Sequence, residues 1–219
     1  MAVYVVFAPA SIRGIYTTWP ECETKVRGVS GAKFQKAPSR ERAESMLAGE
    51  KKTLPPGLYA VVDGNHRGGI GVVLIHQVDA ARQTRQDLST TLAAVFPDGI
   101  PSENGLTFST AEALASVHNV AAELGAAYFA LQRVPAAQAV TLVHDYEGVG
   151  AWLTGSWRTK DPVVRALVEA IRTTVARRQL RVTYQHQRGH QADRMGLDPL
   201  VQANQKAEAL ATEAIRAPA

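Results

Sequence analysis

Two segments of the sequence run from apolar, β-branched residues directly into a carboxylate. The segment "GLYAVVDG" (57–64) reaches Asp63, and "AVTLVHD" (139–145) ends in His144 and Asp145. Unpaired charge is costly in a protein core, so an acid at the end of a buried strand normally has a cation or a hydrogen-bond network beside it. Two strands that each deliver an acid therefore indicate a shared partner.

A third acid, Glu123, lies in a predicted helix beside small apolar residues, Ala121, Ala122, Leu124 and Ala126. Taken singly, an acid in such a place is more often a salt-bridge partner or a boundary residue. Three acids on three elements of one sheet favour a metal site, because hard cations such as Mg²⁺ take oxygen ligands. Two such ions about 3.5–4 Å apart activate a water and stabilise the leaving oxygen in phosphodiester cleavage.

The elements that must position these acids follow from periodicity and capping signals. Strands are predicted at 57–64, 68–77, near 88–96, at 139–145 and at 180–187, and helices at 110–132, 162–178 and 200–216. A capping box from Ser109 to Glu112 opens the first helix, and Asp161 followed by Pro162 opens the second. The order βββαβαβα predicts an α/β fold with three antiparallel strands followed by parallel crossovers.

A smaller module precedes this body. Short strands are predicted around "VYVVF", "GIYTT" and "GAKFQKA", with one helix capped by Thr18 and another capped by Ser39. We therefore expect a β-β-α-β-α domain at 1–47, a linker at 48–57 that contains two prolines and two lysines, and a larger domain at 58–219.

Bulk composition limits the function classes. The chain has 219 residues, is 46% hydrophobic and 20% charged, and contains no run of roughly 20 apolar residues, so a soluble, cytoplasmic protein is expected. Its single cysteine, Cys22, excludes an internal disulfide. Residues 1–52 hold 9 Lys or Arg and 5 Asp or Glu, whereas the remainder holds 15 of each, so the net charge of +4 lies in the first quarter. This distribution indicates a polyanion partner such as nucleic acid, or otherwise a solvated lysine-rich surface.

Together these residues resemble a known family. The body resembles a type 1 ribonuclease H, a ribonuclease H-like five-stranded mixed sheet with flanking helices, through Asp63-Gly64, Glu123 in "NVAAELGAA", Asp145 in "DYEGVGAW", and the loop "GHQAD" that contains His190. Residues 1–47 resemble the hybrid-binding, or viroplasmin-like, domain found ahead of some ribonucleases H, through "GIYTTWPEC" and "GAKFQKA".

The resemblance implies an endonuclease that cuts the RNA strand of RNA–DNA hybrids and leaves 5′-phosphate and 3′-hydroxyl ends. It implies two Mg²⁺ ions, or Mn²⁺, held by Asp63, Glu123, Asp145 and Glu208, and a role for His190 in product release. The expected partner is RNA–DNA hybrid, with double-stranded RNA as a further candidate; a monomer and no membrane association are expected.

The resemblance also implies which residues contact the hybrid. Asn119 corresponds to the family's minor-groove asparagine, which contacts 2′-hydroxyls, and Asn65 and the backbone near Gly64 are further candidates for such contacts. In the N-terminal module, Trp19 and Phe34 correspond to an aromatic pair against the DNA sugars, with Lys33 and Lys36 near phosphates. The alternative for Trp19 and Phe34 is ordinary core packing in a small domain.

Some positions depart from the family pattern. The string "NQKAE" places Glu208 where an aspartate is usual, and the longer loop before it offers Asp193 or Asp198 as the fourth ligand instead. An alternative function is therefore a catalytically weakened module on the same fold that binds hybrid or double-stranded RNA. The segment 78–108 is longer than a minimal hairpin requires, and the sequence predicts no function for it.

Overall fold

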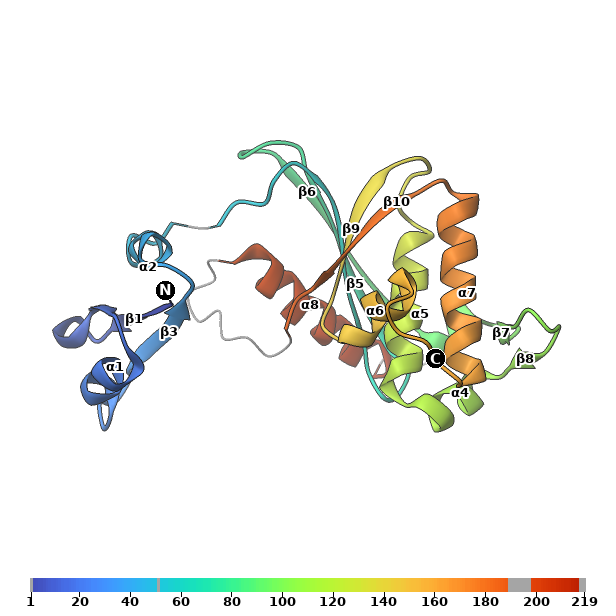
Figure 1. The fold of residues 1–219 in the computed structure, drawn as a ribbon, viewed down its shortest axis with the longest axis horizontal. Helices are drawn as coiled ribbons and strands as arrows, with labels where there is room; N and C mark the ends of the chain where they lie inside the picture. Colours follow the sequence, from blue (N-terminus) through green and yellow to red (C-terminus); the bar gives the residue numbers. More distant parts are fainter. Residues whose placement is uncertain (1, 51, 189–197, 217–219) are drawn as a thin grey trace. The chain divides into compact units, whose positions relative to one another are not determined.

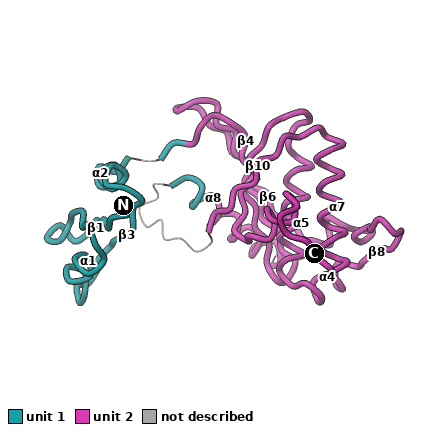
Figure 2. The backbone as a smooth tube through the Cα atoms, viewed as in Figure 1, with its two compact units in different colours: residues 1–53, 191–202 teal, residues 54–190, 203–219 magenta. Residues whose placement is uncertain are grey.

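The computed structural model describes residues 2–50, 52–188 and 198–216 and divides into two compact units. Figure 2 colours Met1–Thr53 with Gln191–Gln202 as the first unit and Leu54–His190 with Ala203–Ala219 as the second. Among the described residues, no helix has both the length and the apolar character needed to cross a bilayer.

The first unit contains a three-stranded antiparallel sheet in the order β2-β1-β3, with a helix on each face. Its elements are β1 (Val3–Ala8), a 3₁₀ turn (Ala10–Ile12), β2 (Gly14–Tyr16), α1 (Trp19–Val26), β3 (Lys33–Ala37) and α2 (Arg40–Leu47). Successive side chains of a strand point to opposite faces, so Val5 packs against α2 while Val6 packs against Cys22 of α1. The predicted β-β-α-β-α order is confirmed, as are the Thr18 and Ser39 caps.

The second unit is built on a five-stranded mixed sheet in the order β10-β9-β4-β5-β6 (Figure 1). Its strands are β4 (Gly57–Gly64), β5 (Gly69–Gln77), β6 (Gln83–Thr91), β9 (Ala139–His144) and β10 (Arg181–His186). Strands β4, β5 and β6 pair antiparallel, whereas β9 runs parallel to both β4 and β10. The predicted arrangement, three antiparallel strands followed by parallel crossovers, is confirmed.

Helices cover both faces of this sheet. They are α3 (Leu92–Val95), α4 (Thr110–Val117), α5 (Asn119–Leu131), α6 (Glu147–Thr154), α7 (Pro162–Arg177) and α8 (Pro199–Ala214), and a short hairpin joins β7 (Ile100–Pro101) to β8 (Thr107–Phe108). Along β5, Ile70 faces the side of α5, and the next residue, Gly71, faces Ala207 of α8. Helix α5 is apolar nearly all round because it lies between the sheet and α7.

Two predicted elements have wrong boundaries, and one helix was not predicted. The third strand is β6, which ends at Thr91, because the Thr91 hydroxyl accepts a hydrogen bond from Ala94 N–H and starts α3 where further strand was expected. The single helix expected at 110–132 is divided at His118, whose backbone has φ 52° and ψ −129°. Helix α6 was not predicted, since its only strong end signal is Gly155 in the left-handed conformation at the C-cap.

Candidate metal centre and nucleic-acid surface

The structure brings together the three carboxylates singled out above. Asp63 lies near the end of β4, Asp145 follows β9, and Glu123 projects from α5. One ligand oxygen from each lies within 4.8 Å of the others, and this is the one group of metal-ligand type found in the described part of the chain. Asp63 is 7% exposed and Glu123 3%, so two of the three acids are buried.

Gly64 allows this convergence. It is cross-strand from Ile70 and so faces α5, and a Cβ atom at this position would overlap the backbone of Ala122 and Glu123. Helix α5 therefore lies directly on the end of β4, with no side chain between them. The Gly64 N–H also donates a hydrogen bond to the Glu123 carboxylate. The Asp-Gly pair thus supplies one acid and the close approach that positions another.

Two histidines hold the backbone next to Asp145. His144 Nδ1 lies 2.9 Å from the carbonyl oxygen of Tyr146, and His186 Nε2 lies 2.9 Å from that of Asp145. Since a carbonyl only accepts, each imidazole donates its N–H. The two rings stack at 5.8 Å, and burial lowers the pKa of His144. The end of β9 is therefore fixed by two hydrogen bonds from imidazole rings to backbone carbonyls.

The electrostatics of Glu123 fit a cation site. Burial, with added repulsion from Asp63 and Asp145, raises its pKa well above the ordinary value, although the bond from Gly64 opposes this. Its Oε2 is buried and has no hydrogen-bond partner. A buried acceptor without a partner, beside two other carboxylates, is the environment that a divalent cation with oxygen ligands would stabilise.

The acids open onto a cleft of about 720 Å³. Asn119 and Glu208 also line it, and both are exposed. Asn119 lies one helical turn before Glu123 on α5, as predicted. Glu208 reaches the cleft because α8 packs directly on β5: a Cβ at Gly71 would overlap the carbonyl oxygen of Ala207.

Of the two alternative fourth ligands, the structure describes Asp198 only. Asp198 does not line the cleft; its carboxylate accepts a hydrogen bond from the Leu200 N–H at the start of α8. Asp193 and the predicted product-release residue His190 lie outside the described residues.

Asn65 lines the cleft, but its side-chain amide makes hydrogen bonds within the protein. Its Oδ1 accepts hydrogen bonds from the backbone N–H groups of Arg67 and Gly69, both at 3.0 Å. Its Nδ2 donates to the Ala211 carbonyl at 2.7 Å. The side chain therefore shapes the β4–β5 turn and ties it to α8, and a contact with hybrid remains a prediction.

The first unit carries an aromatic surface around Trp19. This side chain is 38% exposed and lies 5.6 Å from the ring of Phe34 and 5.3 Å from that of Tyr4. Lys33 and Lys36 are exposed on the same strand as Phe34. Sequence reasoning missed Tyr4, although it alternates with Val6 along β1 and so shares the face of α1.

Comparison with known proteins gives two findings. Residues 2–46 match the family model of the ribonuclease H1 N-terminal domain. Among solved structures, ribonuclease H1 of the halophilic archaeon Halobacterium salinarum NRC-1 is 20% identical with a TM-score of 0.45, over 73% of this chain and 97% of that one. LC11-RNase H1, isolated from compost by a metagenomic approach, is 18% identical with a TM-score of 0.49, over 74% and 97%. Its complex with an RNA/DNA hybrid matches at 15% identity and a TM-score of 0.46, over 73% and 96%.

The family match covers the N-terminal module, and the topology describes the larger unit. The mixed five-stranded sheet with flanking helices is the α/β arrangement that the sequence predicts, so the predicted fold class is confirmed. The family match at residues 2–46 confirms the predicted resemblance for the N-terminal module.

Proposed function

We propose that the protein is an endonuclease that hydrolyses the RNA strand of RNA–DNA hybrids by a two-metal-ion mechanism, giving 5′-phosphate and 3′-hydroxyl ends. The observation that carries this proposal is the cluster of Asp63, Glu123 and Asp145, within 4.8 Å of one another beside an open cleft. The ribonuclease H1 family match and the hybrid complex of LC11-RNase H1 support it.

All four carboxylates would hold metal ions in this proposal. Asp63, Glu123 and Asp145 would hold the ions on a rigid sheet, with Glu208 completing the site from α8. Mg²⁺ or Mn²⁺ bound here would lower the pKa of a water and neutralise charge on the scissile phosphate. Fixed carboxylates need no reorganisation as charge develops, which is why strand ends and a buried helix suit them better than mobile loops.

Selection of RNA would come from the rim of the cleft. Asn119 is exposed there with its amide available on the same helical face as Glu123, and Asn65 and the backbone of Gly64 lie at the same rim. These groups would contact 2′-hydroxyls in the wide minor groove of the hybrid. His190 would assist product release. We assign cutting to the domain at 58–219, hybrid binding to 1–47, and a linker role to 48–57.

The test is cleavage of an end-labelled RNA–DNA hybrid by the full chain. Cutting of the RNA strand is expected with Mg²⁺ or Mn²⁺ and none with excess EDTA, while a DNA duplex of the same sequence stays intact. Glu208→Gln is expected to lower kcat by about 10²-fold or more, since one metal ligand contributes a few kcal/mol. Glu213→Gln, an exposed glutamate on the same helix outside the cleft, is the matched control. Hybrid binding without cutting, with either metal, would establish the binding-module alternative instead.

The aromatic surface of the first unit gives a second prediction. Trp19→Ala is expected to weaken hybrid binding about tenfold or more, because an aromatic contact with nucleic acid contributes about 1–3 kcal/mol. The kcat at saturating hybrid should change little, and Trp19→Phe should retain most of the affinity. Trp19→Ala could also weaken binding by unfolding the N-terminal module. If its melting temperature falls far enough to explain the whole loss of binding, Trp19 is a core residue only.

A further inference from the structure

A second groove, separate from the acidic cleft, is rich in arginine. Its volume is about 470 Å³, and it is lined by Arg158 from the turn after α6, by Arg165 and Arg172 from α7, and by the exposed ring of Trp157. Two carboxylates, Glu103 and Glu169, also line it. We refer to it as the arginine groove.

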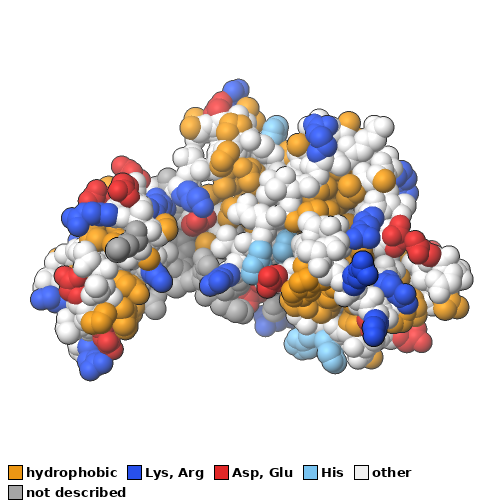
Figure 3. All heavy atoms as spheres, in the orientation of Figure 1, with side chains coloured by type: hydrophobic (Ala, Val, Ile, Leu, Met, Phe, Trp, Pro, Cys, Tyr) orange, Lys and Arg blue, Asp and Glu red, His pale blue; other side chains and the backbone are white. Residues whose placement is uncertain are grey.

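The arginines are available to a ligand. All three are exposed, and the described residues supply no ion-pair partner within 4.0 Å for Arg158 or Arg165. Arg172 donates to the carbonyl oxygen of Trp152 at 2.8 Å, which fixes its guanidinium at the groove. Figure 3 shows Lys and Arg side chains gathered beside hydrophobic surface on the part of the molecule where Figure 1 places α6 and α7.

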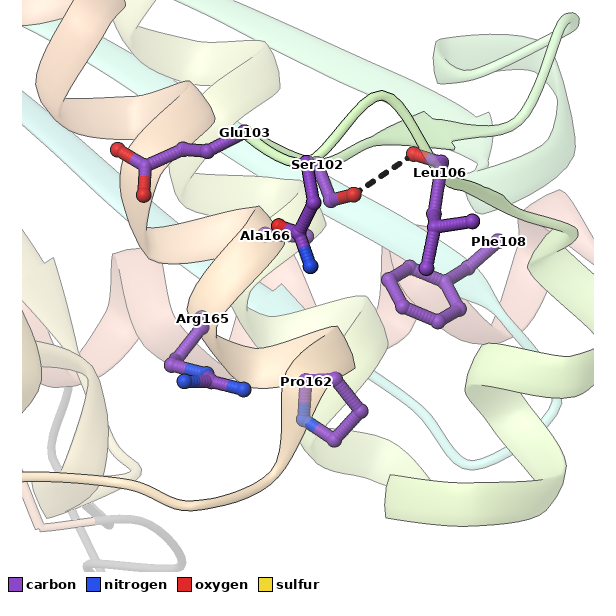
Figure 4. Close-up of a pocket in the computed structure, with 8 residues that line it drawn as sticks. Ser102, Glu103, Leu106, Phe108, Pro162, Arg165 and Ala166 are labelled. Atoms are coloured by element: carbon purple, nitrogen blue, oxygen red, sulfur yellow. Dashed lines mark hydrogen bonds between the residues drawn. The ribbon is translucent and has the colours of Figure 1, made fainter.

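The β7–β8 hairpin forms one wall of the groove through Glu103. The hairpin is closed by the Ser102 hydroxyl, which donates to the Leu106 carbonyl at 2.8 Å. Figure 4 shows Leu106 and Phe108 near Pro162 of α7, with Arg165 on the same helix. This contact places the hairpin against the first turns of α7. The extra chain between β6 and α4 thus has a structural role that its sequence does not predict.

Aromatic rings connect the arginine groove to the acidic cleft. Tyr146 lines the cleft, and its ring lies 5.8 Å from that of Trp152. Trp152 in turn lies 6.0 Å from Trp157 at the groove. A basic surface interleaved with aromatic rings is typical of sites that follow a nucleic-acid backbone. The two features therefore lie on one continuous path.

We infer that the arginine groove binds the phosphate backbone of one strand of the substrate duplex, beyond the nucleotides held in the acidic cleft. Arg165 and Arg172 are two turns apart on α7, about 10.5 Å. One strand of a duplex carries a phosphate about every 3.4 Å of axis, so this spacing corresponds to about three nucleotides. Arginine suits the role because its planar guanidinium makes paired hydrogen bonds to phosphate. The inference rests on the proposed function, since the strand is that of the RNA–DNA hybrid.

The test is the salt dependence of hybrid binding by the full chain, measured by fluorescence anisotropy in an Asp145→Asn background so that the hybrid stays intact. The variant is Arg158→Gln with Arg165→Gln, which leaves the Arg172 hydrogen bond in place. On a long hybrid we expect binding weaker on the order of tenfold at low salt. The slope of log Kd against log salt should fall by about 1.8, which is about 0.9 for each phosphate that the variant no longer neutralises. A hybrid of about 6 base pairs, about 20 Å long, should bind the variant and its parent alike.

Arg177→Gln, an exposed arginine at the end of α7 outside the groove, is the matched control. A double variant with the parent's affinity and slope, or one no different from Arg177→Gln, would overturn the inference while leaving the proposed function intact. If the double variant bound the long and the short hybrid equally more weakly than its parent, the inference would be overturned too. The arginines would then attract the hybrid through their charge alone and not bind one strand in the groove. A parent that binds no hybrid would overturn both.

Discussion

Replacing Glu123 by glutamine is expected to abolish hybrid cutting and, at the same time, to make the metal-free protein more stable. The loss should be about 10³-fold or more in kcat, because the variant removes a metal ligand. The gain follows from the burial of Glu123 and the repulsion it meets from Asp63 and Asp145, which together raise its pKa. Each pKa unit of that shift corresponds to about 1.4 kcal/mol that the ionised form loses on folding.

The sign of the pH dependence can be worked out. Between the unfolded pKa of about 4.5 and the raised folded pKa, folded Glu123 binds more protons than unfolded Glu123, so the stability of the parent falls as pH rises. The Glu123→Gln variant lacks this decline in stability, because glutamine does not titrate. The difference in melting temperature between variant and parent, measured by calorimetry in EDTA, should therefore be small below pH 4.5, grow above it, and level off past the raised pKa.

Glu112 supplies the control of opposite sign. Its carboxylate is hydrogen-bonded to Ser109 in a capping box, which lowers its pKa. Glu112→Gln should therefore lower stability at neutral pH, with the difference disappearing as pH falls through the folded pKa. A Glu123→Gln variant that is less stable than its parent at neutral pH in EDTA would contradict the account of Glu123.

Gly64→Ala is expected to have the second largest effect. The added Cβ would overlap the backbone of Ala122 and Glu123, and backbone cannot rotate away as a side chain can. Helix α5 must shift. We expect this to cost about 3 kcal/mol, the upper end of the usual range of costs for overpacking a core. For a chain of this size that is a fall of about 6–12 °C in melting temperature. Cutting should fall about 10²-fold or more, because Glu123 moves with the helix.

Gly14→Ala is the matched control for this substitution. Gly14 is also a strand glycine, but a Cβ there would meet only Tyr16 Oη at 3.7 Å, an ordinary contact. Its melting temperature and activity should stay close to those of the parent. If Gly64→Ala retained full activity with the same melting temperature, β4 and α5 would not be in the direct contact described, and the convergence of the acids would need another cause.

Much of the fold was predictable because its signals are local. The order of the elements along the chain follows from apolar runs and helical periodicity, and Thr18, Ser39, Ser109 and Asp161 all cap the helices that the sequence assigns to them. Asp63 and Asp145 were identifiable because a carboxylate at the end of an apolar strand conflicts with core packing. Glu123 stood out for the same reason on an apolar helix.

Other features depend on contacts that no short window of sequence contains. The break at His118 places a non-glycine residue at positive φ, which local preference disfavours. The arginine groove joins Glu103, Arg158 and Arg172, which are far apart in the chain. The hydrogen bond from Asn65 to the Ala211 carbonyl joins residues that are 146 positions apart. Tertiary structure sets each of these.

The close packing of α8 on β5 has a practical consequence for position 208. Backbone contacts at Gly71 and Gly69 set where the helix lies, and the side chain at 208 is exposed at the edge of the cleft. The only native thiol, Cys22, is fully buried, and burial raises its pKa. A cysteine introduced at 208 would therefore be a selective attachment point for a spectroscopic label at the edge of the cleft, on a helix whose register backbone contacts at Gly69 and Gly71 set.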